Sequence, residues 1–206
     1  MGKSIVWSSI INLAFCQALN KDEIEKLDQA IGDGDHIFNI QRGLNEALKL
    51  EHELSNLSPE EVFKKIGMKI MTTVGGSSGA LFATLLMGMS KKYSKESNDL
   101  ENLAAMFYEG VEATKKRGKA DIGEKTMLDV LIPVSLSLNK LKNEKNIKTV
   151  AEKIKMVAEE GMLSTKDIMA TKGRASFLGE RAIGHIDPGA RSSQLAINAI
   201  CDEYIK

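Results

Sequence analysis

The sequence predicts an all-α protein, and three features of the chain support this prediction. Apolar residues recur at spacings of three and four along most of its length. At several points a short polar residue is followed three positions later by a carboxylate, a pattern that starts helices. No run of strand length alternates polar and apolar residues. Because the intervening segments are short, the helices are expected to form an antiparallel bundle or barrel.

The periodicity divides the chain into roughly seven to nine helices of about 12 to 22 residues. Capping boxes that begin at Asn20, Ser58 and Asn98 mark three helix starts. Pro59 agrees with the second of these, since proline is well tolerated at the first helical position. The segments with the clearest helical spacing are 5–15, 22–31, 80–89, 100–114, 127–141, 147–169 and 195–205.

The composition indicates one globular domain over residues 1–206. Lys plus Arg and Asp plus Glu number 28 each, so no overall field attracts nucleic acid or anionic lipid. With three prolines and no low-complexity linker, no domain boundary is marked. Any phosphate binding must therefore depend on local geometry, and we expect no nucleic-acid partner.

The chain is expected to be cytoplasmic and to have no membrane span. Its first residues lack the pattern of an export signal. The least polar stretch, 72–89, is interrupted by glycines and is too short to cross a bilayer. Cys16 and Cys201 favour two small buried residues over a disulfide, although spacing alone leaves a disulfide open.

Three aspartates, Asp28, Asp33 and Asp35, form the strongest candidate site. A helix over 22–31 places Asp28 in its last turn, and two flanking glycines let the chain fold back so that the other two approach it. Three adjacent carboxylates repel one another unless a cation lies between them, and all-oxygen ligands suit Mg²⁺. An EF-hand is excluded, because Phe38 and Leu44 stand where it needs glycine and glutamate. The simpler alternative is a solvated acidic turn.

Other phosphate donors are spread along the sequence. His36 and Asn39 start the next predicted helix, and the imidazole can donate to a phosphate oxygen. The segment 75–79, Gly-Gly-Ser-Ser-Gly, precedes an apolar helix and can form an anion-binding nest. Arg174 has the fork of donors that clamps phosphate, and Asp-Pro-Gly at 187–189 favours a turn. An arginine–aspartate pair that only fastens a loop explains these last residues equally well.

Taken together, these motifs resemble the DhaL-type (Dak2-type) nucleotide-binding subunit of dihydroxyacetone kinase. The resemblance runs in order from about residue 20 to the C-terminus. It rests on the segments 27–36, 75–79, 123–129, 173–181 and 184–190. In two places the chain departs from the usual pattern, with Ile37 in place of glycine and Ala80 in place of proline.

The resemblance implies an eight-helix antiparallel up-and-down barrel with a nucleotide site at one end. Asp28, Asp33 and Asp35 would hold two Mg²⁺ ions that bridge the phosphates of ADP or ATP. The implied nucleotide-binding residues are His36, Ile37, Phe38, Asn39, Gly76, Ser77, Ser78, Gly118, Thr126, Met127, Arg174, Asp187, Pro188 and Gly189.

The resemblance also implies a phosphotransferase that acts with partners. Dihydroxyacetone would be bound covalently to a histidine of a separate kinase subunit, which accepts the phosphoryl group. Bound ADP would be rephosphorylated in place by a phosphotransferase-system phosphoprotein, while free exchange of ATP remains open. Two other functions also remain open: a non-catalytic Mg–ADP-binding regulator of a transcription factor, and a kinase subunit for another small ketose.

Overall fold

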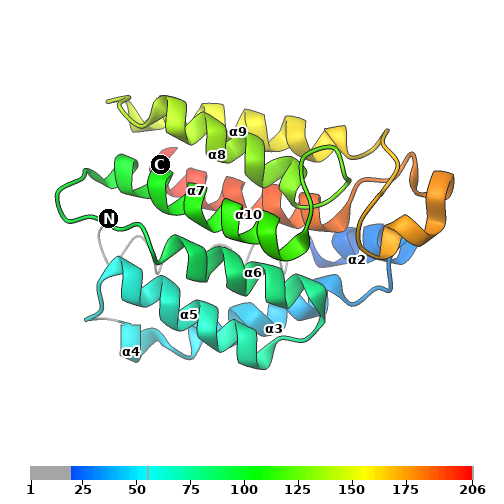
Figure 1. Ribbon diagram of the computed structural model, residues 1–206, viewed down its shortest axis with the longest axis horizontal. Helices are drawn as coiled ribbons and strands as arrows, with labels where there is room; N and C mark the ends of the chain where they lie inside the picture. Colours follow the sequence, from blue (N-terminus) through cyan, green and yellow to red (C-terminus); the bar gives the residue numbers. More distant parts are fainter. Residues whose placement is uncertain (1–19, 55, 206) are drawn as a thin grey trace.

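In the computed structural model, which describes residues 20–54 and 56–205, every regular element is helical, so the all-α prediction is confirmed. Eight α-helices of 11 to 20 residues dominate these ranges (Figure 1). They are α2 (Lys21–Ile31), α3 (His36–Leu48), α5 (Pro59–Thr73), α6 (Gly76–Met89), α7 (Asp99–Gly118), α8 (Leu128–Leu141), α9 (Ile147–Ser164) and α10 (Pro188–Ile205). Two short elements complete the set, α4 (Glu51–Leu54) and the 3-10 helix η1 (Arg174–Ala182). The helix predicted over 5–15 and Cys16 lie outside the described residues.

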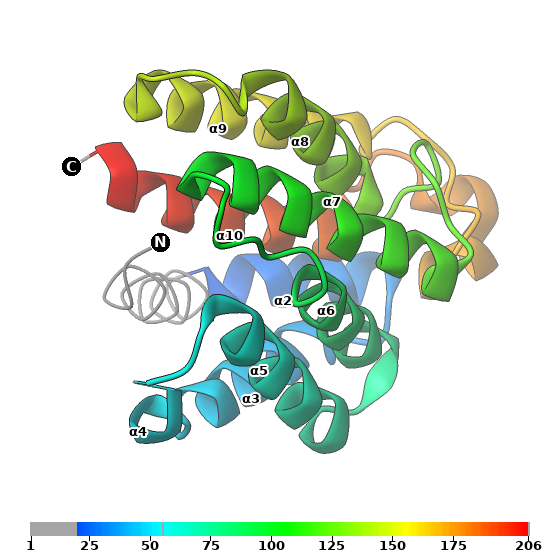
Figure 2. The ribbon, with the colours of Figure 1, turned by 60° about the vertical axis from the view of Figure 1, so that its left-hand side comes forward.

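The eight long helices form a closed ring. Each packs against the next along the chain, and α10 packs against α2 to complete the circuit (Figure 2). Successive helices run in opposite directions, as predicted for an up-and-down barrel. The ends of α2, α5, α7 and α9 therefore share one rim with the starts of α3, α6, α8 and α10. That rim carries all five segments on which the family resemblance rests.

The wall of the ring is held by buried apolar side chains. The largest cluster joins α6 to α10 and includes Ala104, Val130, Val134 and Ile154. A smaller cluster joins α3, α4 and α5. Cys201 is a free, buried cysteine in the main cluster, as expected for a small apolar residue. Burial of this kind is the main source of stability of such a fold.

Two glycines allow α6 and α7 to cross closely. A β-carbon on Gly88 would lie 2.7 Å from Cα of Gly110, and one on Gly110 would lie 2.6 Å from the backbone oxygen of Leu85. Both distances are shorter than atoms tolerate, and the second involves a backbone atom that cannot move alone. The crossing therefore requires glycine on both helices.

Gly110→Ala is expected to destabilise the fold by about 2–3 kcal/mol, because the added methyl forces the two helices apart. Chemical denaturation measures the change. Gly75→Ala provides the matched control, since a β-carbon at Gly75 has no atom within 4 Å. A Gly110→Ala protein as stable as this control would contradict the packing described.

The helix ends confirm some local predictions and correct others. Capping boxes are present at Ser58 and Asn98. The box predicted at Asn20 is wrong, since its side chain makes no capping hydrogen bond to α2. The helix predicted over 147–169 ends at Ser164, and the one predicted to start at residue 195 already begins at Pro188.

Among the residues described, no helix combines the length and apolar character needed to cross a bilayer.

Candidate metal and nucleotide site

Asp28 is fixed in place by the chain reversal between α2 and α3. Its side chain is 5% exposed, and its Oδ2 accepts a hydrogen bond from the backbone N–H of His36 at 3.0 Å. The carboxylate thus caps the start of α3, where the helix dipole favours negative charge. Gly32 is required directly beneath it, because a β-carbon there would lie 1.9 Å from Oδ1 of Asp28.

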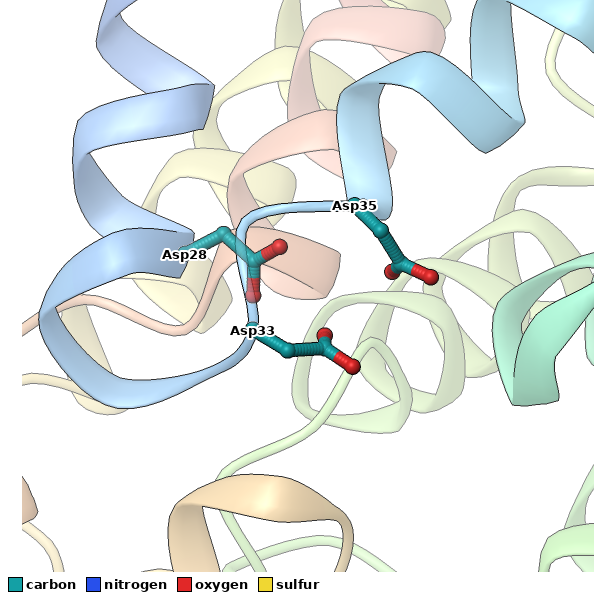
Figure 3. A group of neighbouring side chains, drawn as sticks. All are labelled: Asp28, Asp33 and Asp35. Carbon is teal, nitrogen blue, oxygen red and sulfur yellow. The ribbon is translucent and has the colours of Figure 1, made fainter.

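Asp33 and Asp35 complete the acidic group from the loop that follows (Figure 3). One ligand atom from each of the three aspartates lies within 4.8 Å of the others, and Asp33 and Asp35 are exposed. Asp35 precedes α3 but makes no capping hydrogen bond to it. The predicted convergence of the three carboxylates is therefore confirmed, and their oxygen atoms suit a hard divalent cation.

Arg174 reaches this loop from η1, which packs against α2. Its Nη2 lies 2.7 Å from Oδ2 of Asp33, and its side chain is 70% exposed. Sequence reasoning left a choice between a phosphate clamp and an arginine–aspartate pair. The structure contains such a pair, although the partner is Asp33 rather than Asp187. An ion pair this exposed contributes little to stability, so the arginine can exchange partners readily.

The start of α6 faces the acidic group across a narrow gap. A β-carbon on Gly76 would lie 3.1 Å from Nδ2 of Asn39 and 3.8 Å from Oδ2 of Asp35. Nδ2 of Asn39 is buried and has no hydrogen-bond partner among the described residues. The N-terminus of α6 and the unpaired amide of Asn39 can donate hydrogen bonds to an anion beside the carboxylates. Gly76, with φ of 76°, has no side chain that would fill this space. A metal ion would fit beside the carboxylates, and a phosphate would fit beside the start of α6.

Ser77 and Ser78 lie in the first turn of α6. We predicted a glycine-rich loop ending before a helix at residue 80, but the helix begins at Gly76. The two hydroxyls and the first backbone N–H groups of α6 are therefore on the same helix end. Gly79 belongs to the packing of this turn, because a β-carbon there would lie 2.6 Å from a methyl group of Val74.

His36 faces the protein interior. Its side chain is buried, and its Nε2 lies 2.9 Å from the hydroxyl of Ser192 on α10. Burial lowers the pKa of His36, while Asp28 and Asp35 act against this shift. The imidazole therefore connects the acidic loop to the start of α10 through a hydrogen bond. It also lies beside the predicted phosphate position.

The two residues after His36 occupy different environments. The Ile37 side chain is fully buried with Ile24 and Leu195. Any contact of Ile37 with a nucleotide would therefore involve its backbone. Phe38 is 42% exposed, with the ammonium of Lys21 4.8 Å from its ring centre.

Across the rim, Met127 lies beside the 187–189 turn. A β-carbon on Gly189 would lie 3.6 Å from Cβ of Met127, so two segments far apart in sequence meet here. The Thr126 hydroxyl accepts a hydrogen bond from the N–H of Leu128, the first residue of α8. Gly118 ends α7 on the same rim.

Asp187 caps α10, directly ahead of Pro188 at its first position. Its Oδ2 accepts a hydrogen bond from the N–H of Ala190 at 2.7 Å, and its own N–H donates to the hydroxyl of Thr165. Burial raises the pKa of Asp187 to about 7, although the bond from Ala190 opposes this shift. The turn is thus fixed at both ends before any ligand binds.

Asp187→Asn is expected to change how stability depends on pH. The unfolded chain loses this proton near pH 3.8, whereas the folded protein keeps it up to about pH 7. The stabilisation that the group supplies is therefore complete below pH 3.8 and is lost as pH rises to about 7. The stability of the variant relative to the parent should rise between these pH values and level off above them. A difference that stays constant in denaturant titrations of nucleotide-free protein would contradict this.

Sequence reasoning missed several residues that shape this rim. Ser192 and Thr165 carry no motif of their own, and their partners are distant in sequence. Lys125 belongs to a segment that supported the family resemblance but was given no role. Its position inside a polar loop gave no sign that its side chain is 1% exposed.

The fold and the site define a helical-barrel domain that brings an acidic loop together with a helix N-terminus. The DAK2 domain family matches residues 30–202. The chain belongs to the DhaL family of dihydroxyacetone kinase subunits, which are phosphotransferases.

Two relatives illustrate this similarity. The "PEP-dependent dihydroxyacetone kinase 1, ADP-binding subunit DhaL" of Listeria innocua is 46% identical over 181 residues, covering 88% of this chain and 86% of the relative. The Escherichia coli ADP-binding subunit DhaL is 39% identical over 168 residues, covering 81% and 80%.

A solved structure has the same fold over nearly the whole of this chain. The dihydroxyacetone kinase of C. freundii in complex with AMP-PNP and Mg²⁺ superposes with a TM-score of 0.74 at 25% identity. The match covers 98% of this chain but 34% of that one, so most of the longer kinase has no counterpart here.

Proposed function

We propose that this chain is the nucleotide-binding subunit of a dihydroxyacetone kinase. It binds Mg–ADP or Mg–ATP and donates a phosphoryl group to dihydroxyacetone held covalently on a separate kinase subunit. The observation that carries the proposal is the placement of three convergent aspartates opposite the start of α6. This arrangement offers oxygen ligands to a metal and N–H donors to a phosphate across one gap.

In this proposal Asp28, Asp33 and Asp35 would hold two Mg²⁺ ions, whose positive charge would offset the negative charge of the phosphates. Ser77 and Ser78 donate to phosphate oxygens from the first turn of α6. The buried Nδ2 of Asn39 supplies a further donor, since it has no partner among the residues described. Arg174 leaves its exposed pair with Asp33 to bind phosphate.

The remaining nucleotide contacts come from the other side of the rim. Gly118, Met127 and the 187–189 turn would line the part of the site away from the metal. Met127 is 6% exposed and lies against Gly189, so this wall is already assembled. A preformed wall lowers the entropic cost of ordering the site when a nucleotide binds.

A separate acceptor subunit is supported by the names of the relatives. Relatives that this chain matches over most of their length are named as subunits. The C. freundii kinase, by contrast, has about two thirds of its chain outside the match. We infer that the sugar-binding part resides on another protein. The names of the relatives also support phosphoenolpyruvate as the ultimate donor, with ADP recharged in place by a phosphotransferase-system phosphoprotein.

Mass analysis of the purified protein for retained ADP tests the donor directly. The protein would then be supplied either with ATP or with phosphoenolpyruvate and the phosphocarrier proteins, each with and without the dihydroxyacetone-binding subunit. We expect retained ADP, rephosphorylation by the carriers alone, and dihydroxyacetone phosphate only when the acceptor subunit is present.

The other outcomes each select another function. Exchange of free ATP with normal turnover would exclude in-place recharging but keep the kinase. Binding of Mg–ADP without turnover with any cognate sugar-binding subunit would contradict the kinase and favour a regulator. Turnover with a different small ketose would change the substrate only.

A further inference from the structure

Lys125 has a buried charged side chain and a left-handed backbone conformation, and each of these features costs free energy. Its side chain is 1% exposed, although lysine is rarely buried. Its φ is 61°, a left-handed conformation that glycine adopts more easily. Lys119, the other non-glycine residue with positive φ in the described ranges, has an exposed side chain. Strain of this kind persists where the surrounding structure requires the residue, which makes Lys125 a candidate for a specific role.

The ammonium group of Lys125 joins two distant segments of the rim. Nζ donates a hydrogen bond to the backbone oxygen of His185 at 2.5 Å and another to the backbone oxygen of Thr165. These acceptors lie 60 and 40 residues away in sequence. One comes just after α9 and the other just before α10. A single buried cation therefore connects three of the rim's loops.

The three loops are those that carry one wall of the site. The loop with Lys125 continues to Met127, and the loop with His185 continues to Asp187. Thr165 accepts a hydrogen bond from the N–H of Asp187 through its own hydroxyl at 3.1 Å. The backbone and side chain of Thr165 thus bind both of the other segments.

Acidic groups around Lys125 favour its charged form. Burial lowers the pKa of Lys125, while Asp187, Asp129 and Asp167 act in the opposite direction. Asp129 is itself 1% exposed and accepts hydrogen bonds from the N–H groups of Gly123 and Thr126 at 2.6 and 2.7 Å. The strained turn around Lys125 is therefore held from both ends.

We propose that Lys125 is a positioning residue for the nucleotide. Its buried ammonium holds the segments 121–129, 165–172 and 184–190 in the arrangement that places Met127 against the 187–189 turn. The inference rests on the proposed nucleotide site but assigns a role to a residue outside it. Lys125 acts through backbone carbonyls of neighbouring loops.

The choice of lysine at this position supports a role for the side chain. If only the backbone conformation mattered, glycine would satisfy φ of 61° without strain. Lysine in its place accepts both strain and desolvation, and what it gains are two charge-assisted hydrogen bonds to different loops.

Binding of Mg–ADP to Lys125→Met and Lys125→Gly tests the proposal by isothermal titration. Methionine keeps the length of the side chain but removes the donors, while glycine also removes the strain. We expect each variant to bind Mg–ADP about 10- to 100-fold more weakly than the parent. The loss should be similar at low and high Mg²⁺, because the metal loop is not altered. Normal affinity in a folded Lys125→Gly protein would overturn the proposal.

Lys155→Met is the matched control. Lys155 pairs with Asp202 at 2.5 Å, between α9 and α10 and far along the helices from the rim. This variant loses a lysine contact between α9 and α10 and should keep parental affinity for Mg–ADP. An equal loss in both variants would show a general effect of stability and would also overturn the proposal.

Thr165→Val keeps the inference testable if the Lys125 variants do not fold. It preserves the shape of the residue while removing the hydroxyl that binds the N–H of Asp187. Weaker Mg–ADP binding is expected here too, and unchanged binding would count against the positioning role. Failure of the parent protein to bind Mg–ADP would instead refute the proposed function, so the two failures are distinguishable.

Discussion

Replacing Asp33 with asparagine is expected to reduce phosphoryl transfer by about 100-fold or more. The substitution keeps the size of the side chain but removes one of three negative charges that converge within 4.8 Å. A neutral amide is a weaker ligand for Mg²⁺ than a carboxylate. Nucleotide affinity should fall with it, and the fall should be largest where Mg²⁺ is limiting.

Turnover with the cognate sugar-binding subunit measures the effect, together with Mg–ADP titrations at several Mg²⁺ concentrations. Asp202→Asn is the control, because Asp202 lies near the C-terminal end of α10, at the opposite rim. Asp33 also pairs with Arg174, so Arg174→Gln should be measured in parallel. Undiminished turnover in Asp33→Asn would refute the metal assignment.

Gly32→Ala is expected to weaken Mg-dependent nucleotide binding by about 10- to 100-fold without removing any charge. A β-carbon at this position would overlap Oδ1 of Asp28 at 1.9 Å, so the carboxylate must rotate away or the loop must shift. Either response separates Asp28 from the other two aspartates. It also disturbs the hydrogen bond from the N–H of His36 that caps α3.

A double-mutant cycle with Asp28→Asn distinguishes this effect from general damage. If Gly32→Ala acts by displacing the Asp28 carboxylate, its effect should nearly disappear once that carboxylate has been replaced. Losses that simply add in the double variant would show that the two residues act independently.

The acidic loop was predictable from the sequence because its geometry is local. Asp28, Asp33 and Asp35 lie within one helix end and one glycine-containing turn, so spacing alone indicated that they converge. The same holds for the capping boxes at Ser58 and Asn98, which involve residues three apart. The false box at Asn20 shows the limit of this reasoning, since a matching pattern does not ensure that the side chain makes the bond.

The opposite wall of the site was less predictable because it depends on contacts between distant segments. Nothing in the sequence around Lys125 indicates that its ammonium reaches His185 and Thr165. The burial of His36 against Ser192 likewise joins positions 156 residues apart. Helical periodicity gave the elements and their order, whereas these polar contacts become visible only once the ring has closed.

The closure of the ring between α2 and α10 also constrains how the protein is made. Neighbouring helices are adjacent in sequence and can pair as soon as they leave the ribosome, which makes most of the fold fast to form. The last contact is different, since Arg191 on α10 forms a double hydrogen-bonded ion pair with Glu23 on α2, both bonds being 2.9 Å. A chain still in synthesis lacks α10, and with it the turn at 187–189 and the Ser192 partner of His36. The nucleotide site that we propose is therefore complete only after α10 has been synthesised.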